Sequence, residues 1–219
     1  MGEESNPLAT CHSVWAVLMT IIVLLYVFFD VNHFLRLAFT IGWGRLFEKR
    51  KTFDESTEIY GIATTQDMDI FIRNLSNARY IRELDFARFH FYDRTGLYDE
   101  FRKINAHVLQ SATNIRYRKP IPMFSTYKIT TKVIYWEEKA LYIEHQFVTL
   151  SDGFVRAVVL SKQGTIGMDV PQVMAKLTGR DVSYRPEPPA EFQDWISSME
   201  KSSNRWQSLS NCHQEHGHR

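Results

Sequence analysis

The chain has almost no cysteine: only Cys11 and Cys212 carry thiols, and they stand at opposite ends of its 219 residues. A disulfide framework is therefore excluded, and a reducing compartment is the simpler expectation for the folded part. The chain also has no excess of charge of either sign, because the formal net charge is +1. Without a general basic surface, the composition predicts no nucleic-acid partner.

Several sequence motifs of catalysis and cofactor binding are missing as well. The sequence holds neither the Gly-x-Ser-x-Gly turn of serine hydrolases nor the glycine-rich loops that bind dinucleotides or nucleotide phosphates. Its eight histidines form no helical metal pair. The Cys212-His213 pair, with His216 and His218, is more simply explained as part of a polar tail than as a metal site. We therefore expect no metal and no cofactor.

One segment, in contrast, is too apolar for an ordinary water-soluble surface. Residues 13–29 contain only two polar side chains, those of Ser13 and Thr20. As a helix the segment is about 25 Å long, near the lower limit for crossing the hydrocarbon core of a bilayer. A secretory signal, with release of the remaining chain after cleavage, is the alternative. No lysine or arginine precedes the segment and no Ala-x-Ala-like site follows it, so we prefer a membrane anchor.

The charges behind this segment predict the orientation of the anchor. Five basic residues follow it closely: Arg36, Arg45, Lys49, Arg50 and Lys51. The positive-inside rule then places the large C-terminal part in the cytosol. The apolar residues within 31–47 either continue the helix or lie along the membrane surface, and the sequence does not separate these two arrangements.

The folded part is organised around one long helix. Residues 78–95 contain neither Pro nor Gly, and Gly96 follows as a residue suited to the left-handed conformation that ends helices. Cap-forming side chains precede it at Asn74, Ser76 and Asn77. Apolar residues recur at steps of three and four, with further aromatic residues beside them. The pattern predicts a helix of about five turns that is covered on more than one side.

Five strand-like segments accompany this helix, one before it and four after it. They are residues 58–65, 108–118, 126–136, 141–150 and 154–165. Short turns join the last three, so these should form an antiparallel meander. A doubly wound fold is excluded because strands and helices do not alternate. We predict an α+β fold in which a curved antiparallel sheet of about five strands wraps around one long central helix.

The C-terminal part differs in character from residue 170 onward. A stiff Arg-Pro-Glu-Pro-Pro connector at 185–189 leads to a short helix at 190–198, and a polar tail follows Lys201. Phe192, Trp195 and Ile196 should dock this helix on the domain. We divide the chain into an anchor with a juxtamembrane helix (1–50), a folded domain (51–169) and a C-terminal extension (170–219).

Three short motifs carry a resemblance to a known family. They are Asp67-Met-Asp69, Asn74-Leu-Ser-Asn-Ala-Arg-Tyr-Ile-Arg-Glu83 and Asp85-Phe-Ala-Arg88. In this order they resemble hotdog-fold acyl-thioester hydrolases, and more closely the membrane-anchored thioesterase-superfamily-member-six group. The resemblance covers most of the chain after about residue 55. It implies a hotdog fold, a homodimer with acyl-thioester sites between protomers, and a place at the endoplasmic reticulum membrane.

The resemblance also implies site residues. In active relatives a carboxylate near the helix start acts as base or nucleophile, which makes Asp69, Asp67 and Glu83 the catalytic candidates. Substrate-binding candidates surround the helix start: Asn74, Ser76, Asn77 and Tyr80. The physical chemistry suits Asp69 as a base that takes a proton from water, and the first amides of the helix as donors to a negative oxygen.

Two functions stay open. The first is hydrolysis of a fatty acyl-CoA, and the second is a catalytically silent acyl-lipid binding or scaffolding protein at the membrane. Where the group has its histidine this chain has Asn74, and where the group has its first asparagine it has Ser76; both changes favour the silent protein. Purely structural explanations compete with these site assignments. Asp67 and Asp69 can be ordinary loop acids that the positive end of the following helix dipole favours, and Tyr80 can be a core residue. The simplest partners for Glu83 are the arginines of its own helix, Arg79, Arg82 and Arg88.

Overall fold

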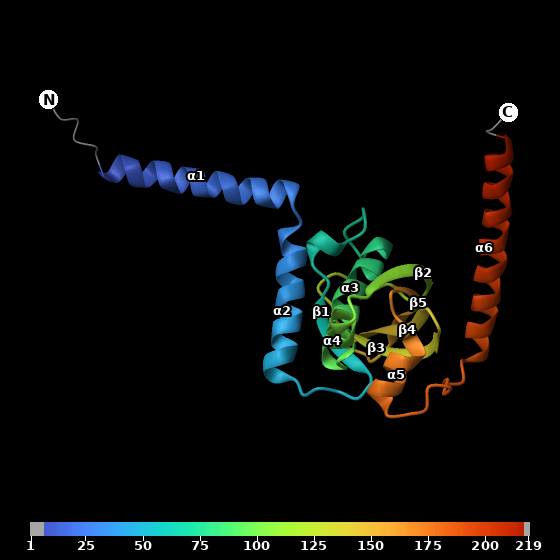
Figure 1. Ribbon diagram of the computed structural model, residues 1–219. Coiled ribbons are helices and arrows are strands. Elements are labelled where there is room, and N and C mark those ends of the chain that lie inside the picture. The colour runs from blue at the N-terminus through green and yellow to red at the C-terminus, as the bar shows by residue number, and fades with distance from the viewer. Residues whose placement is uncertain (1–6, 217–219) are drawn as a thin grey trace.

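The computed structural model describes residues 7–216, with side chains for residues 12 and 14–207 (Figure 1). Its centre is one antiparallel sheet in the strand order β1-β3-β4-β5-β2. The strands are β1 Thr57–Ile62, β2 His107–Tyr117, β3 Thr126–Glu137, β4 Ala140–Thr149 and β5 Val155–Ile166. The predicted strands and the β3-β4-β5 meander are confirmed, with end points that differ by at most three residues.

The long helix α3, Asn77–Arg94, lies against this sheet as predicted. Its buried Tyr80, Leu84 and Ala87 share one core cluster with Tyr127 and Phe147 of the sheet. The helix begins after Ser76, whose side chain makes no capping bond, although its backbone N–H donates to the Asp67 carbonyl at 2.8 Å. These elements form the α+β hotdog architecture that the sequence predicted.

Three elements were not predicted from the sequence. A short 3-10 helix, η1 Thr65–Asp67, precedes α3, and α4 Leu97–Lys103 begins directly after Gly96. The third is α5, Val170–Thr178, where the Asp169 carboxylate accepts from the Gln172 N–H at 3.3 Å. Gly179 ends α5 at φ 70°, a conformation that glycine adopts without strain.

The C-terminal helix is longer than the sequence analysis predicted. Helix α6 runs from Ala190 to His216 in one piece, so the prediction of a short helix followed by a polar tail was wrong about where the helix ends. Neither Pro nor Gly occurs in this stretch, and nothing local stops the helix. The docking prediction is confirmed, because Phe192 is fully buried and its ring lies 4.7 Å from that of Tyr142.

The N-terminal part forms two helices, α1 Pro7–Phe28 and α2 Val31–Phe47. Within the described residues no single helix has both the length and the hydropathy needed to cross a membrane; 14–28 and 31–47 meet that requirement only together, as a pair bent by 86°. Helix α2 lies along α3 (Figure 1). The two backbones come close at Gly44, where an added Cβ would lie 3.1 Å from the His90 ring.

Candidate functional site

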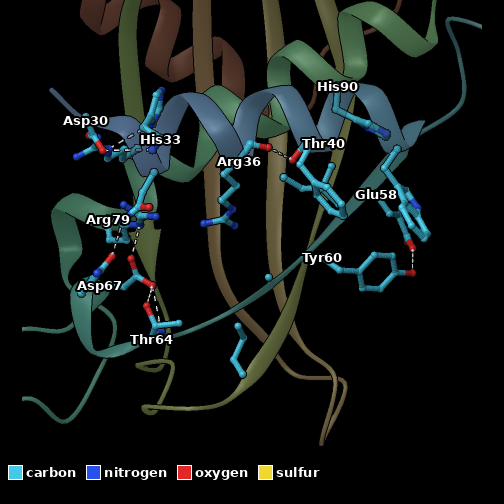
Figure 2. Close-up of a pocket in the computed structure, with 18 of the residues that line it drawn as sticks. Asp30, His33, Arg36, Thr40, Glu58, Tyr60, Thr64, Asp67, Arg79 and His90 are labelled. Carbon is cyan, nitrogen blue, oxygen red and sulfur yellow. Dashed lines mark hydrogen bonds and ion pairs between the residues drawn. The ribbon is translucent and has the colours of Figure 1, made fainter. Parts of the chain in front are cut away.

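A cavity of about 750 Å³ lies between α2 and β1 (Figure 2). One end is charged and is formed by Asp67, Arg79 and Arg36. The middle of the wall is largely apolar and includes Phe39 and Trp43 of α2 and residues 59–62 of β1, and Glu48, Glu58 and His90 line the cavity beyond it. Such a division suits an amphiphilic ligand, because the apolar wall accepts a hydrocarbon chain and the charged end faces a polar head.

The charged end is built around Glu83, which is fully buried on α3. Arg36 of α2 donates to both of its carboxylate oxygens, at 2.6 and 2.5 Å. Arg79 stands one helical turn earlier on α3, and its Nε lies 2.9 Å from Glu83 Oε1 and 2.8 Å from Asp67 Oδ1. The buried Tyr127 hydroxyl is close by, and burial together with the negative charge of Glu83 raises the pKa of this phenol. Glu83 and Asp67 are therefore both neutralised by arginine.

Asp67 is tied to the backbone as well. Its Oδ2 accepts from the Thr64 N–H at 3.0 Å and from the Thr64 hydroxyl at 2.7 Å, which closes a capping box around η1. Because its other oxygen faces Arg79, both oxygens of this carboxylate have partners. Asp67 therefore joins η1 to α3, and both of its carboxylate oxygens are engaged by protein partners.

Asp69 sits differently from the other two candidate acids. Its Oδ1 accepts from the backbone N–H groups of Phe71 (3.2 Å) and Arg73 (3.1 Å), which holds a loop whose Ile72 adopts φ 53°. Among the three acids, all within the described part of the chain, it alone makes no ion pair. It does not line the cavity, although it lies only a few residues before α3.

The four predicted binding residues surround the start of α3 but do not line the cavity. Tyr80 is buried, with its ring 4.9 Å from that of Phe147, and burial raises its pKa to about 12. The Asn77 carbonyl accepts from the Tyr117 hydroxyl at 3.0 Å, and the Asn74 carbonyl accepts from the Asp69 N–H at 2.8 Å. Of the seven predicted site residues, all of which the structure describes, only Asp67 lines the cavity.

The sequence analysis did not identify the residues that α2 and β1 bring to the site. Arg36 is the most important of these, because it neutralises Glu83 and its guanidinium lies 4.5 Å from the centroid of the Phe86 ring. Figure 2 shows its side chain pointing from α2 toward β1. One sequence signal was available: a single arginine stands among the apolar residues of 31–44, where a charge needs a buried partner. Arg79 is a partner of Glu83 as expected, whereas Arg82 pairs with Asp30 and Arg88 with Asp85.

Comparison with known proteins agrees with the fold. A family model described as "Thioesterase-like superfamily" matches residues 63–197. The chain is 49% identical over 187 residues to "Protein THEM6" of Drosophila melanogaster, covering 85% of this chain and 96% of that protein. It is 33% identical over 190 residues to "Protein THEM6" of Xenopus laevis, with 87% and 91% covered. Among solved structures, a hypothetical protein from Thermus thermophilus, TT1821, matches 57% of this chain and 96% of its own, with TM-score 0.50 and 14% identity.

Proposed function

Because the chain belongs to the thioesterase-like superfamily, we propose that it binds a fatty acyl thioester of the acyl-CoA class at a membrane surface. The cavity between α2 and β1 carries this proposal, since it joins an apolar wall to a charged end. The acyl chain lies along Phe39, Trp43 and Ile62, and the thioester and its polar carrier lie toward Arg36 and Arg79. The proposed site of action is the endoplasmic reticulum membrane, with the domain on the cytosolic side, as the basic residues after α1 favour.

Binding without efficient hydrolysis is the form of this proposal that the geometry supports best. A general base must accept a proton from water, but Asp67 and Glu83 are both held by arginine and buried. The replacement of the group's histidine by Asn74 points the same way.

Hydrolysis remains the second candidate because of Asp69. This carboxylate is outside the arginine network and precedes α3, whose first two amides, of Asn77 and Ala78, can polarise a carbonyl, whereas the Arg79 N–H already donates to the Ser76 carbonyl at 2.9 Å. Such a reaction places the thioester beside Asp69, which, unlike Asp67 and Arg79, does not line the cavity between α2 and β1.

Binding to the full chain in detergent or nanodiscs tests the first candidate. We expect saturable binding of palmitoyl-CoA, weakened about tenfold or more by Ile62→Asp, because a charge on the apolar wall opposes the acyl chain. Leu150→Asp is the matched control, since Leu150 is 46% exposed and Ile62 48%, and Leu150 does not line the cavity. Equal affinities of the two variants would contradict the assignment of the cavity.

Thiol release from the same palmitoyl-CoA separates the two candidates. The binding proposal predicts no release above the protein-free rate. Release that falls about 100-fold or more in Asp69→Asn, a loss of the size expected for a general base, would instead establish hydrolysis through Asp69.

We further propose that two copies of the chain pair through β2. In the described structure this strand is bonded only to β5, so its outer edge offers unpaired backbone groups, and Leu109 on it is 58% exposed. Such an edge is a ready template for another strand. Leu109→Lys should shift the mass measured by light scattering from dimer to monomer, whereas Leu150→Lys should not. A wild-type chain that is monomeric at micromolar concentration would refute this pairing.

A further inference from the structure

Helix α2 has two faces of opposite character. The inner face meets α3 through Arg36, Leu37 and Gly44. The outer face carries six large apolar side chains that are each at least half exposed: Phe34, Leu35, Phe39, Trp43, Leu46 and Phe47. The rings of Phe39, Trp43 and Phe47 contact one another in sequence, and an exposed apolar surface of this kind marks an interaction site.

The position of α1 identifies what covers this outer face. Helix α1 ends at Phe28 and α2 begins at Val31, where the Asp30 carboxylate accepts from the His33 N–H at 3.2 Å and so starts the new helix. The helices meet at 86°, and Figure 1 shows α1 leaving on the side of α2 opposite the sheet. The described apolar side chains of α1, from Val14 to Phe28, are exposed.

We infer that α2 lies in the plane of a lipid bilayer, with its outer face among the acyl chains, while α1 enters the bilayer along the normal. At 86°, a helix along the normal leaves its neighbour parallel to the surface. Aromatic side chains such as Trp43 are favoured at this level of a membrane. The inference rests on the membrane attachment in the proposed function, and it does not depend on acyl-thioester binding.

Charge at the end of α2 fits an anionic bilayer. Arg45 lies in the last turn of α2, Lys49 and Arg50 follow the helix, and all three are exposed. At the level of the lipid headgroups each basic residue near an anionic surface adds attraction. Salt bridges from Arg45 to Asp93 and from Arg50 to Asp99 also join this basic end to the folded domain, which fixes the domain against the surface.

This arrangement has a consequence for the cavity. Phe39 and Trp43 belong both to the outer face of α2 and to the cavity wall. The cavity therefore opens beside the bilayer, and a ligand with an acyl chain reaches it from the adjoining leaflet.

Depth measurements on the full chain test the inference. Single nitroxide labels at Leu35→Cys, Phe39→Cys and Leu46→Cys, in a Cys11→Ser/Cys212→Ser background, are placed in vesicles of phosphatidylcholine and phosphatidylserine. The rate at which each nitroxide collides with oxygen is then compared with the rate at which it collides with a water-soluble nickel chelate. The ratio of the two rates gives the depth of the label. We expect the three labels at one depth, about 5–10 Å into the boundary between headgroups and acyl chains. Leu150→Cys, on the folded domain, should remain in water.

Two results would overturn the inference. If α2 continued along the normal, labels at 35 and 46 would differ in depth by about 16 Å, since helices rise ~1.5 Å per residue. If α2 stayed in solution, all three labels would resemble Leu150→Cys. A label at Val23→Cys in α1 distinguishes these failures, because a buried label there with water-exposed labels on α2 overturns only the inference. A water-exposed label at 23 overturns the membrane attachment too, and palmitoyl-CoA binding is measured independently of both.

Discussion

Replacing Glu83 by alanine is expected to lower the free energy of unfolding by about 3 kcal/mol, the low end of the range for a broken buried pair, because it leaves the partly buried Arg36 charge uncompensated. Glu83 is fully buried and holds both Arg36 and Arg79. Arg79 keeps Asp67 as a partner, but Arg36 loses its only described ion-pair partner. Urea titration of the full chain in detergent, followed by tryptophan fluorescence, measures the change.

Two further variants sharpen this measurement. Asp85→Ala, on the same helix, removes a partly exposed pair with Arg88 and should cost no more than ~1 kcal/mol. The double variant Arg36→Met/Glu83→Met removes both charges and should recover most of the loss, since apolar residues often replace buried ion pairs at little cost. A Glu83→Ala loss as small as that of Asp85→Ala would show that α2 does not pack on α3 as described.

Acid should destabilise the wild-type chain through His145 by about 2 kcal/mol between pH 6.5 and pH 5. Burial, with a smaller contribution from the positive charge of Arg88, lowers the pKa of His145 to about 3. The folded state therefore stays neutral at this site while the unfolded chain binds a proton below about pH 6.5. The contribution of the neutral His145 to the free energy of unfolding is fully present above pH 6.5. It is lost as the pH falls from there toward 3.

The variant His145→Gln isolates this contribution. Glutamine can keep bonds to the two neighbours of the imidazole, Thr131 Oγ1 at 3.0 Å and Ser161 Oγ at 3.2 Å, but it does not titrate. The stability gap between wild type and variant should therefore shrink by about 2 kcal/mol from pH 6.5 to pH 5. Burial also lowers the pKa of His90, against the opposing effect of Glu48. Because the wild type and the His145→Gln variant both contain His90, its contribution cancels in the difference between their free energies of unfolding. A gap that stays constant with pH would contradict the burial of His145.

The central helix and the strands were predictable because their signals are local. Residues 78–95 have helical periodicity and end at Gly96, and each strand is bounded by turn residues. The packing of α2 was not predictable in this way, since an apolar run such as 31–47 suits a bilayer and a protein core equally well. The length of α6 was missed because its polar C-terminal half offers neither a stop signal nor an apolar stripe.

The site was less predictable than the fold. The motif around Asp67 and Glu83 singled out two of the right carboxylates, but Arg36 comes from a segment 47 residues away from Glu83 along the chain. Only the folded chain brings Asp67 and Glu83 together with Arg36 and Arg79. Because these arginines neutralise both carboxylates, the arrangement does not favour catalysis by either acid. The division at residue 50 stays a prediction; since α2 contributes Arg36 to the site, any shortened chain used for binding should begin before Val31.

Photo-crosslinking tests the central claim, that an acyl chain lies between α2 and β1, most directly. A palmitoyl-CoA analogue with a diazirine near the end of its acyl chain is irradiated with the full chain in nanodiscs, and the labelled peptides are identified by mass spectrometry. Labels should fall on α2 near Phe39 and Trp43 and on β1 near Ile62, should disappear with excess palmitoyl-CoA, and should be much weaker in Ile62→Asp. Competable labels on the far side of α3, near Tyr80 and Tyr117, would contradict the account and place the acyl chain at the opposite face of the central helix.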